Sequence, residues 1–136
     1  MNVKLRLGTR EDAGACGPIC YAAFKAIADQ HNFPPDFPSP EIATTLLSEL
    51  LAHPNFYGVV AELDGRVVGS NFVDERSTIA GIGPITVDPV TQNRAVGRKL
   101  MEHVLERFAQ RRFPGVRLVQ AAYHNRSLSL YANKML

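Results

Sequence analysis

Two apolar runs joined by the dipeptide Asp64-Gly65 constrain the fold more than any other feature of the chain. The first run, F-Y-G-V-V-A-E, covers residues 56–62, and the second, R-V-V-G-S-N-F-V, covers residues 66–73. Asp-Gly favours a tight turn with positive φ, whose twist matches that of two antiparallel strands. The sequence therefore predicts a β-hairpin in the middle of the chain.

The remaining elements follow from hydrophobic period and from start and stop signals. Thr9 with Asp12 resembles a capping box, and Ser39 with Pro40 marks a second helix start. The proline-rich segment 31–40 between these helices is either a surface connector or a wall of a substrate site. Periodicity predicts further strands at 3–7, 79–87 and 116–122, and helices at about 13–29, 40–51, 96–108 and 127–136.

This order, β-α-α-β-β-β-α-β-α, predicts an α+β fold of three layers, with a mixed, mostly antiparallel sheet flanked by helices. The strand at 79–87 is unusual because it contains Gly81, Gly83 and Pro84. Proline cannot donate to a ladder and glycine weakens a strand. We therefore expect this strand to bulge and to part from a neighbour there.

Length and composition limit the function classes. The 136 residues fit one domain, 1–136, and the formal net charge of +2 gives no argument for nucleic acid or a membrane surface. Charged residues interrupt the apolar residues of the N-terminus, so this segment is predicted to be neither a signal peptide nor a membrane span. We therefore expect a cytoplasmic protein. Cys16 and Cys20 have neither redox nor zinc spacing, so we expect buried, reduced thiols and no metal.

The stretch V-D-P-V-T-Q-N-R-A-V-G-R-K-L, residues 87–100, joins a strand to a helix. Unpaired N–H groups at such a helix start attract anions. Ala95 and Gly97 leave the backbone accessible, and Arg94, Arg98 and Lys99 add positive charge. This favours a phosphate-binding loop as strongly as it favours a basic helix start with small packing residues.

The same stretch resembles the acetyl-CoA signature of the GNAT superfamily of N-acetyltransferases, with Gln92, Ala95 and Gly97 at its fixed positions. The end of the chain, H-N-R-S-L-S-L-Y-A-N-K-M-L, is similar to a second GNAT segment through Asn125, Leu130 and Tyr131. The hairpin and the start R-L-G-T-R-E-D-A are also typical of that family.

The resemblance implies transfer of an acetyl group from acetyl-CoA to a primary amine of a small molecule or peptide, by direct attack. Tyr131 would protonate the departing thiolate, although a core tyrosine is the alternative. Glu75, Asp74, His124 or a water chain would take the proton of the amine. The cofactor would contact Ile85, Thr86, Val87, Gln92, Asn93, Arg94, Ala95, Val96, Gly97, Arg98 and Asn125.

Two departures from the family pattern support an alternative, a weakly catalytic module that binds acyl-CoA or a protein partner without transfer. Ala95 stands where the family has its first glycine. The chain also ends at Leu136, where the family continues into one or two further strands. We therefore expect a truncated domain whose strand 116–122 has an open edge, and which is either poorly stable alone or pairs that edge with a second copy of itself.

Overall fold

The computed structural model describes residues 2–32, 37–91, 94–118 and 121–122. Its helical elements are a 3₁₀ turn, Arg10–Asp12, and three α-helices: α1 Ala13–Gln30, α2 Pro40–Ala52 and α3 Arg94–Arg111. Its strands are β1 Val3–Leu7, β2 Phe56–Leu63, β3 Arg66–Asp74, β4 Ile79–Ile82, β5 Ile85–Val87, β6 Gly115–Leu118 and β7 Ala121–Ala122.

The strands form one mixed, mostly antiparallel sheet, as predicted. Its order is β1-β2-β3-β4-β6, with β5 beside β3 and β7 beside β5. The pairs β1–β2, β2–β3, β3–β4 and β3–β5 are antiparallel, whereas β4–β6 and β5–β7 are parallel. In the described part of the chain, β6 ends this path on the side opposite β1.

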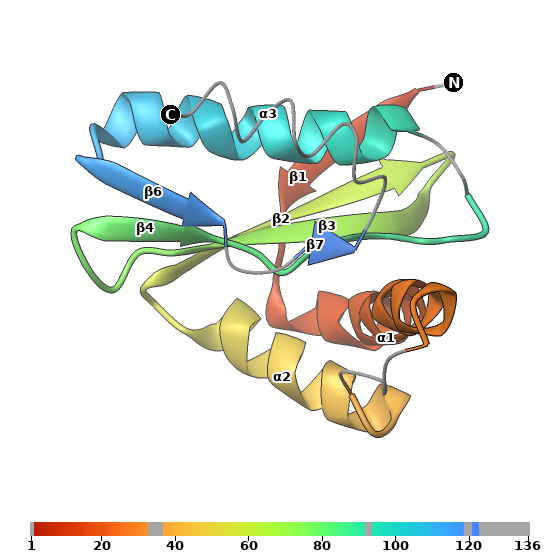
Figure 1. Ribbon diagram of the computed structural model, residues 1–136. Helices are drawn as coiled ribbons and strands as arrows, with labels where there is room; N and C mark the ends of the chain where they lie inside the picture. The colour runs from red at the N-terminus through yellow and green to blue at the C-terminus, as the bar shows by residue number, and fades with distance from the viewer. Residues whose placement is uncertain (1, 33–36, 92–93, 119–120, 123–136) are drawn as a thin grey trace.

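Helices cover both faces of the sheet, which gives the expected α+β arrangement of three layers (Figure 1). Helix α3 lies on one face, where Leu100 and Val104 pack against aliphatic residues of the sheet. Helices α1 and α2 lie on the other face and pack against Val60 and Phe72. Phe37 from the proline-rich segment is buried there, edge-on against Phe24 of α1 at a centroid distance of 5.9 Å. It belongs to this second core.

Local signals form as the sequence predicts. Asp64 and Gly65 have φ values of 53° and 81°, the two positive angles that a hairpin turn of this kind needs. The N–H of Ile42 donates to Ser39 Oγ at 3.3 Å, so Ser39 caps α2.

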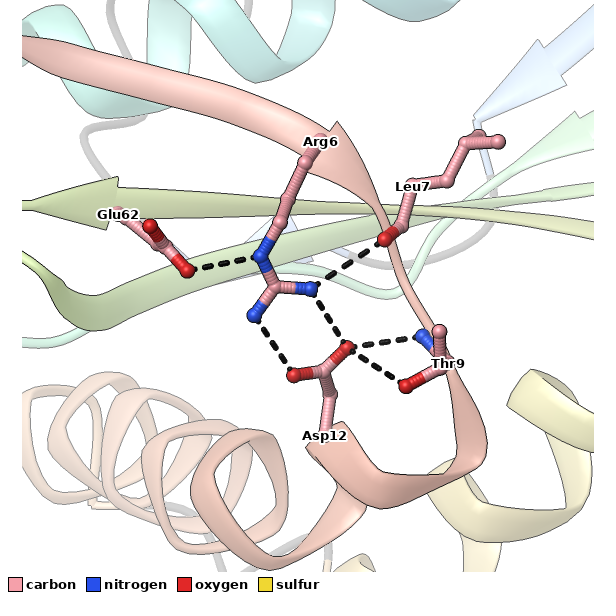
Figure 2. A network of polar contacts seen from close by, with 5 residues as sticks. All are labelled: Arg6, Leu7, Thr9, Asp12 and Glu62. Atoms are coloured by element: carbon pink, nitrogen blue, oxygen red, sulfur yellow. Dashed lines mark hydrogen bonds and ion pairs between the residues drawn. The ribbon is translucent and has the colours of Figure 1, made fainter.

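The side chain of Arg6 links β1 to the start of α1 through hydrogen bonds (Figure 2). Its two terminal nitrogens each donate to one oxygen of Asp12 at 2.9 Å, and its Nε donates to Glu62 at 2.7 Å. Asp12 also accepts from the N–H of Thr9 at 2.8 Å, as expected of a capping box. The hydrogen bonds from Arg6 hold the pKa of the Asp12 carboxyl below its usual range. One guanidinium thus joins β1, β2 and the turn into α1.

The single strand predicted at 79–87 is wrong in one respect, because the chain forms two short strands instead. β4 ends at Ile82 and β5 begins at Ile85, and the break falls at Gly83-Pro84. Gly83 has φ 121°, which suits glycine, and its N–H donates to Phe72 O at 2.7 Å. The predicted helix at 127–136 lies outside the described residues.

Candidate functional site

The junction between β5 and α3 is built by a turn around Asp88. The Asp88 N–H donates to Val68 O at 2.8 Å, which anchors the end of β5 to β3. The Asp88 carboxylate then accepts from the N–H of Val90 at 3.0 Å, and the main-chain carbonyl of Asp88 accepts from the N–H of Thr91 at 3.1 Å. The turn directs the chain out of the sheet and into α3.

The start of α3 has the features expected of an anion site. The helix begins at Arg94 and has no acidic residue in its first turn. Val96 and Gly97 are buried, whereas Arg98 and Lys99 are exposed. The first N–H groups of any helix lack partners within it and carry its positive dipole end. Ala95 adds only a methyl group there. The predicted contacts Gln92 and Asn93 lie outside the described residues.

The backbone of β5 divides its groups between two neighbours. Thr86 lies opposite Ser70 of β3, and Val87 lies opposite Gly69. The backbone N–H and C=O groups of successive strand residues point to alternate sides of the strand. Since the N–H of Asp88 donates to β3, the backbone groups of Thr86 also point to β3, and those of Ile85 and Val87 point to the other side. That other side is the edge along which the resemblance places the acyl-CoA arm.

The strand was expected to part from a neighbouring strand, and it does so only at the break between β4 and β5, at Gly83-Pro84. Before it, β4 pairs with β6, and after it Ile85 and Thr86 pair with Ala121 and Ala122 of β7. Among the described residues, the parting does not continue beside β5. The physical reason is that β7, although two residues long, supplies the partner groups that the edge of β5 requires.

Both acidic side chains considered as proton acceptors are held by arginines. Glu75 accepts from Arg107 through both oxygens, at 2.5 and 2.8 Å. Asp74 accepts from Arg76 at 2.9 and 2.8 Å, and these bonds lower the pKa of its carboxyl. Neither carboxylate can take a proton from a substrate unless its ion pair opens.

Arg107 also belongs to a cluster that no sequence motif indicates. Its guanidinium lies 3.8 Å from the ring centroid of Tyr57, whose hydroxyl is 2.6 Å from His103 Nε2. Burial raises the pKa of Tyr57 and lowers that of His103. Three distant segments meet here, so no local pattern could have indicated the cluster. His103 also lines a hollow of about 570 Å³ between α3 and Leu5.

A second unexpected feature lies on the α1 side of the sheet. Ser70 and Thr86 are each 1% exposed; the Ser70 hydroxyl meets the thiol of Cys16, and the Thr86 hydroxyl has no hydrogen-bond partner in the described structure. A buried polar group without a partner costs about 1–3 kcal/mol. Cys16 of α1 lies against Ser70, and burial raises the pKa of its thiol to about 11. Neither cysteine forms a disulfide and both are buried, as predicted, and the Cys16 thiol is not an activated nucleophile.

Several predicted site residues cannot be placed, because Asn125, Tyr131 and His124 lie outside the described residues. Within the described ranges, no group of three or more His, Cys, Asp or Glu residues could hold a metal ion. No helix in the same ranges is long and apolar enough to cross a membrane.

Comparison with known proteins gives a family match and a set of similar folds. The sequence model described as "Acetyltransferase (GNAT) family" matches residues 23–135. No curated protein matches the chain.

Three solved structures illustrate the likeness of fold. An N-acetyltransferase (PaiA) from Thermoplasma acidophilum, in complex with coenzyme A, has a TM-score of 0.75 at 13% identity, covering 98% of this chain and 89% of its own. A GNAT family acetyltransferase from Brucella melitensis, in complex with acetyl-CoA, has a TM-score of 0.66 at 21% identity, and the match covers 92% of this chain and 80% of its own. An aminoglycoside acetyltransferase from an uncultured soil metagenomic sample has a TM-score of 0.62 at 24% identity, and the match covers 98% of this chain and 88% of its own.

Proposed function

The chain belongs to the GNAT acetyltransferase family, and we propose that it transfers an acetyl group from acetyl-CoA to a primary amine of a small molecule or peptide. The observation that carries the proposal is the junction of β5 with α3. A helix start without acidic residues, with small residues and two exposed cations, follows directly after a strand whose outer edge faces away from β3.

In this proposal the pyrophosphate of acetyl-CoA binds the N–H groups of residues 93–98, with Gln92 beside it. Arg94, Arg98 and the helix dipole supply positive charge. The pantetheine arm lies along the outer edge of β5 and bonds the backbone of Ile85 and Val87, passing Thr86 between them, and Asn125 contacts it. Because this edge is paired with β7 in the present structure, the arm takes the place of β7 there.

The acceptor amine attacks the thioester carbon directly, and no enzyme nucleophile is needed. The pKa of about 11 for Cys16 supports this, because its thiol stays protonated at neutral pH. The N–H of Ile85 stabilises the oxyanion, a contribution of about 3–4 kcal/mol for one such donor. Tyr131 protonates the leaving thiolate. Glu75 serves as proton acceptor only if its bonds to Arg107 open.

A binding module without transfer is the second candidate, and two observations favour it. Ala95 stands in place of a glycine, and β7 occupies the edge that the arm would need. Pairing of the β6 edge with a second copy of the chain is compatible with either candidate. Light scattering that detects a concentration-dependent dimer would support that pairing, and a monomer at all concentrations would exclude it.

Calorimetry with acetyl-CoA tests the cofactor site in three proteins: the parent chain, Arg98→Glu and Arg111→Glu. Both variants reverse an exposed arginine of α3, one in its first two turns and one in its last. We expect Arg98→Glu to weaken binding at least tenfold and Arg111→Glu to leave it within twofold. Equal effects of the two variants would overturn the assignment of the phosphate site.

Release of free thiol from acetyl-CoA in the presence of an amine panel separates the enzyme from the module. Transfer by the parent chain, slowed about 10²-fold by Tyr131→Phe with unchanged acetyl-CoA binding, supports the proposed mechanism. Binding without any amine-dependent thiol release would instead establish the module.

A further inference from the structure

The outer edge of β1 is an open end of the sheet. β1 is the first strand in the order of the sheet, and in the described part of the chain only β2 pairs with it. An edge strand presents a row of unpaired N–H and C=O groups, which natural proteins blunt with prolines, bulges or charged side chains. β1 contains no proline, and its register with β2 is regular. Its backbone can therefore accept another strand.

The hydrogen-bond pattern shows which backbone groups of β1 point outward. The N–H of Gly8, the residue after β1, donates to Gly58 O at 2.9 Å, which makes these two residues a hydrogen-bonded pair. Such pairs recur at every second residue of an antiparallel ladder, so Lys4 and Arg6 direct their backbone groups to β2. The backbone groups at positions 3, 5 and 7 therefore point outward.

These three outward positions match a second copy of themselves. A two-fold axis at Leu5 places Leu5 opposite Leu5 of the second copy, and Val3 opposite Leu7. All three positions then become hydrogen-bonded pairs, with two bonds in each. A register shifted by two residues leaves one of the positions without a partner in β1. The edge is thus self-complementary, as a two-fold interface requires.

The apolar side chains of this edge favour the same arrangement. Val3 and Leu5 pack against the core beneath α3, and Leu7 lies on the same face of the strand. The side chain of Leu7 is 61% exposed in the single chain. In the two-fold arrangement it lies beside Val3 of the second copy, so pairing covers an apolar side chain that the fold leaves in water.

The charged side chains of β1 do not prevent this pairing. On the α1 side of the sheet, Lys4 lies opposite Arg6 of the second copy, and like charges at such positions are unfavourable. Arg6 is bonded to both Asp12 and Glu62, two carboxylates for one guanidinium (Figure 2). Lys4 of the second copy therefore meets a group whose net charge is negative.

Helix α3 adds charge complementarity beside the same edge. The hollow between Leu5 and α3 is lined on the helix side by Lys99, Glu102, His103 and Glu106, and both Lys99 and Glu106 are exposed. A two-fold axis at Leu5 reverses the direction of the second α3. The Lys99 end of each helix then faces the Glu106 end of the other, so opposite charges meet on both sides of the axis.

We infer that the outer edge of β1 binds a second copy of this chain, in antiparallel register about Leu5, and that Lys99 of each copy pairs with Glu106 of the other. This interface is separate from the predicted pairing at β6, because β1 and β6 end the sheet path on opposite sides. The inference does not depend on the proposed transfer of an acetyl group.

Sedimentation velocity over a wide range of concentration tests the surface with three matched variants: Leu7→Lys, Ile42→Lys and Leu118→Lys. Each replaces an exposed apolar side chain, on β1, α2 and β6 respectively. We expect the parent chain to dimerise, and Leu7→Lys to raise the dissociation constant of the dimer at least tenfold. Ile42→Lys and Leu118→Lys should leave it within twofold of the parent.

Charge reversal tests the contact between the helices. Glu106→Lys should raise the dissociation constant at least fivefold, because its new cation faces Lys99 of the second copy. Adding Lys99→Glu to the same chain exchanges the two charges and should restore the constant to within twofold of the parent. A merely structural effect of either substitution would not be rescued by the other.

A cysteine at the axis tests the register. Residues in a hydrogen-bonded pair have Cα atoms about 5.5 Å apart, which a disulfide can span. The native cysteines are buried. Oxidation should therefore cross-link Leu5→Cys to a covalent dimer, and it should leave Leu118→Cys uncross-linked.

Three results would overturn the inference. A parent chain that stays monomeric at all concentrations would leave the β1 edge to a partner of another kind. A dimer weakened by Leu118→Lys and not by Leu7→Lys would place the interface at β6. A dimer weakened by Leu7→Lys, with neither rescue by the charge exchange nor a cross-link in Leu5→Cys, would exclude this register.

Discussion

Ser70 and Asn71 are neighbours in β3 that face opposite sides of the sheet, and both are buried. Asn71, on the α3 side, accepts from the N–H of Phe72 at 2.9 Å and donates to Leu100 O at 3.4 Å. Ser70, on the α1 side, meets only the weakly polar thiol of Cys16 among the described residues. The polar group on the α3 side is thus bonded more strongly than the one on the α1 side.

The helices show the same contrast. The face of α3 that packs on the sheet consists of large side chains, among them Val96, Leu100 and Met101. The buried side of α1 is made mostly of small residues: Ala13, Cys16, Gly17, Cys20, Ala23 and Ala28, with Phe24 as the exception. Small side chains permit close approach of a helix but contribute less apolar burial. The two faces therefore gain stability in different ways, one through large apolar side chains and the other through close helix packing.

The largest expected effect belongs to the α3 face. Leu100→Ala removes a fully buried side chain from the aliphatic core, so we expect a loss of about 3–4 kcal/mol in the free energy of unfolding. Leu105→Ala, on the half-buried side of the same helix, is the control and should cost about 1 kcal/mol. Urea titration measures both. Similar losses would contradict the view that this face carries most of the stability.

On the α1 side, Gly17→Ala should cost about 2–3 kcal/mol, because helices α1 and α2 meet there. A Cβ at Gly17 would lie 2.5 Å from the Cα of Thr44 and closer still to its hydroxyl. Gly14 in the same helix has nothing within 4 Å of such a Cβ. Gly14→Ala should therefore stabilise the protein by up to about 1 kcal/mol. If both variants melt at the same temperature, this close approach does not exist.

Cys16 should make stability fall at alkaline pH. Burial raises the pKa of its thiol to about 11 in the folded state, from an ordinary value near 9. As the pH rises from about 9 to 11, the unfolded chain releases this proton first, so the free energy of unfolding decreases by about 2 kcal/mol. Cys16→Ala should remove that decrease while Cys20 remains. An unchanged slope in Cys16→Ala would place the titration elsewhere.

The smallest effect compares the two polar groups directly. Thr86→Val removes an unbonded hydroxyl and should raise the free energy of unfolding by up to about 1 kcal/mol. Asn71→Ala removes two hydrogen bonds and should lower it by about 2 kcal/mol. Equilibrium unfolding in urea measures both changes. A loss of stability in Thr86→Val would mean that the hydroxyl has a partner within the folded chain.

The sequence predicted those features that depend on neighbouring residues. The Asp64-Gly65 turn, the Ser39 cap and the break at Gly83-Pro84 each follow from a local rule, and each forms. Pairings between distant segments were not predictable in the same way. The position of Ser70 opposite Thr86 depends on the register of two strands that are not consecutive, and the two residues are 16 positions apart along the chain. The contact of β7 with β5 rests on two alanines that carry no distinctive pattern.

The central claim is that acetyl-CoA binds along the outer edge of β5, with its pyrophosphate at the start of α3. A crystal structure of the full chain with acetyl-CoA tests this most directly. We predict the thioester oxygen within hydrogen-bond distance of the Ile85 N–H, and the pantetheine arm in the place where β7 pairs with β5 in the present structure. An arm bound elsewhere, or a pyrophosphate away from the start of α3, would contradict the account.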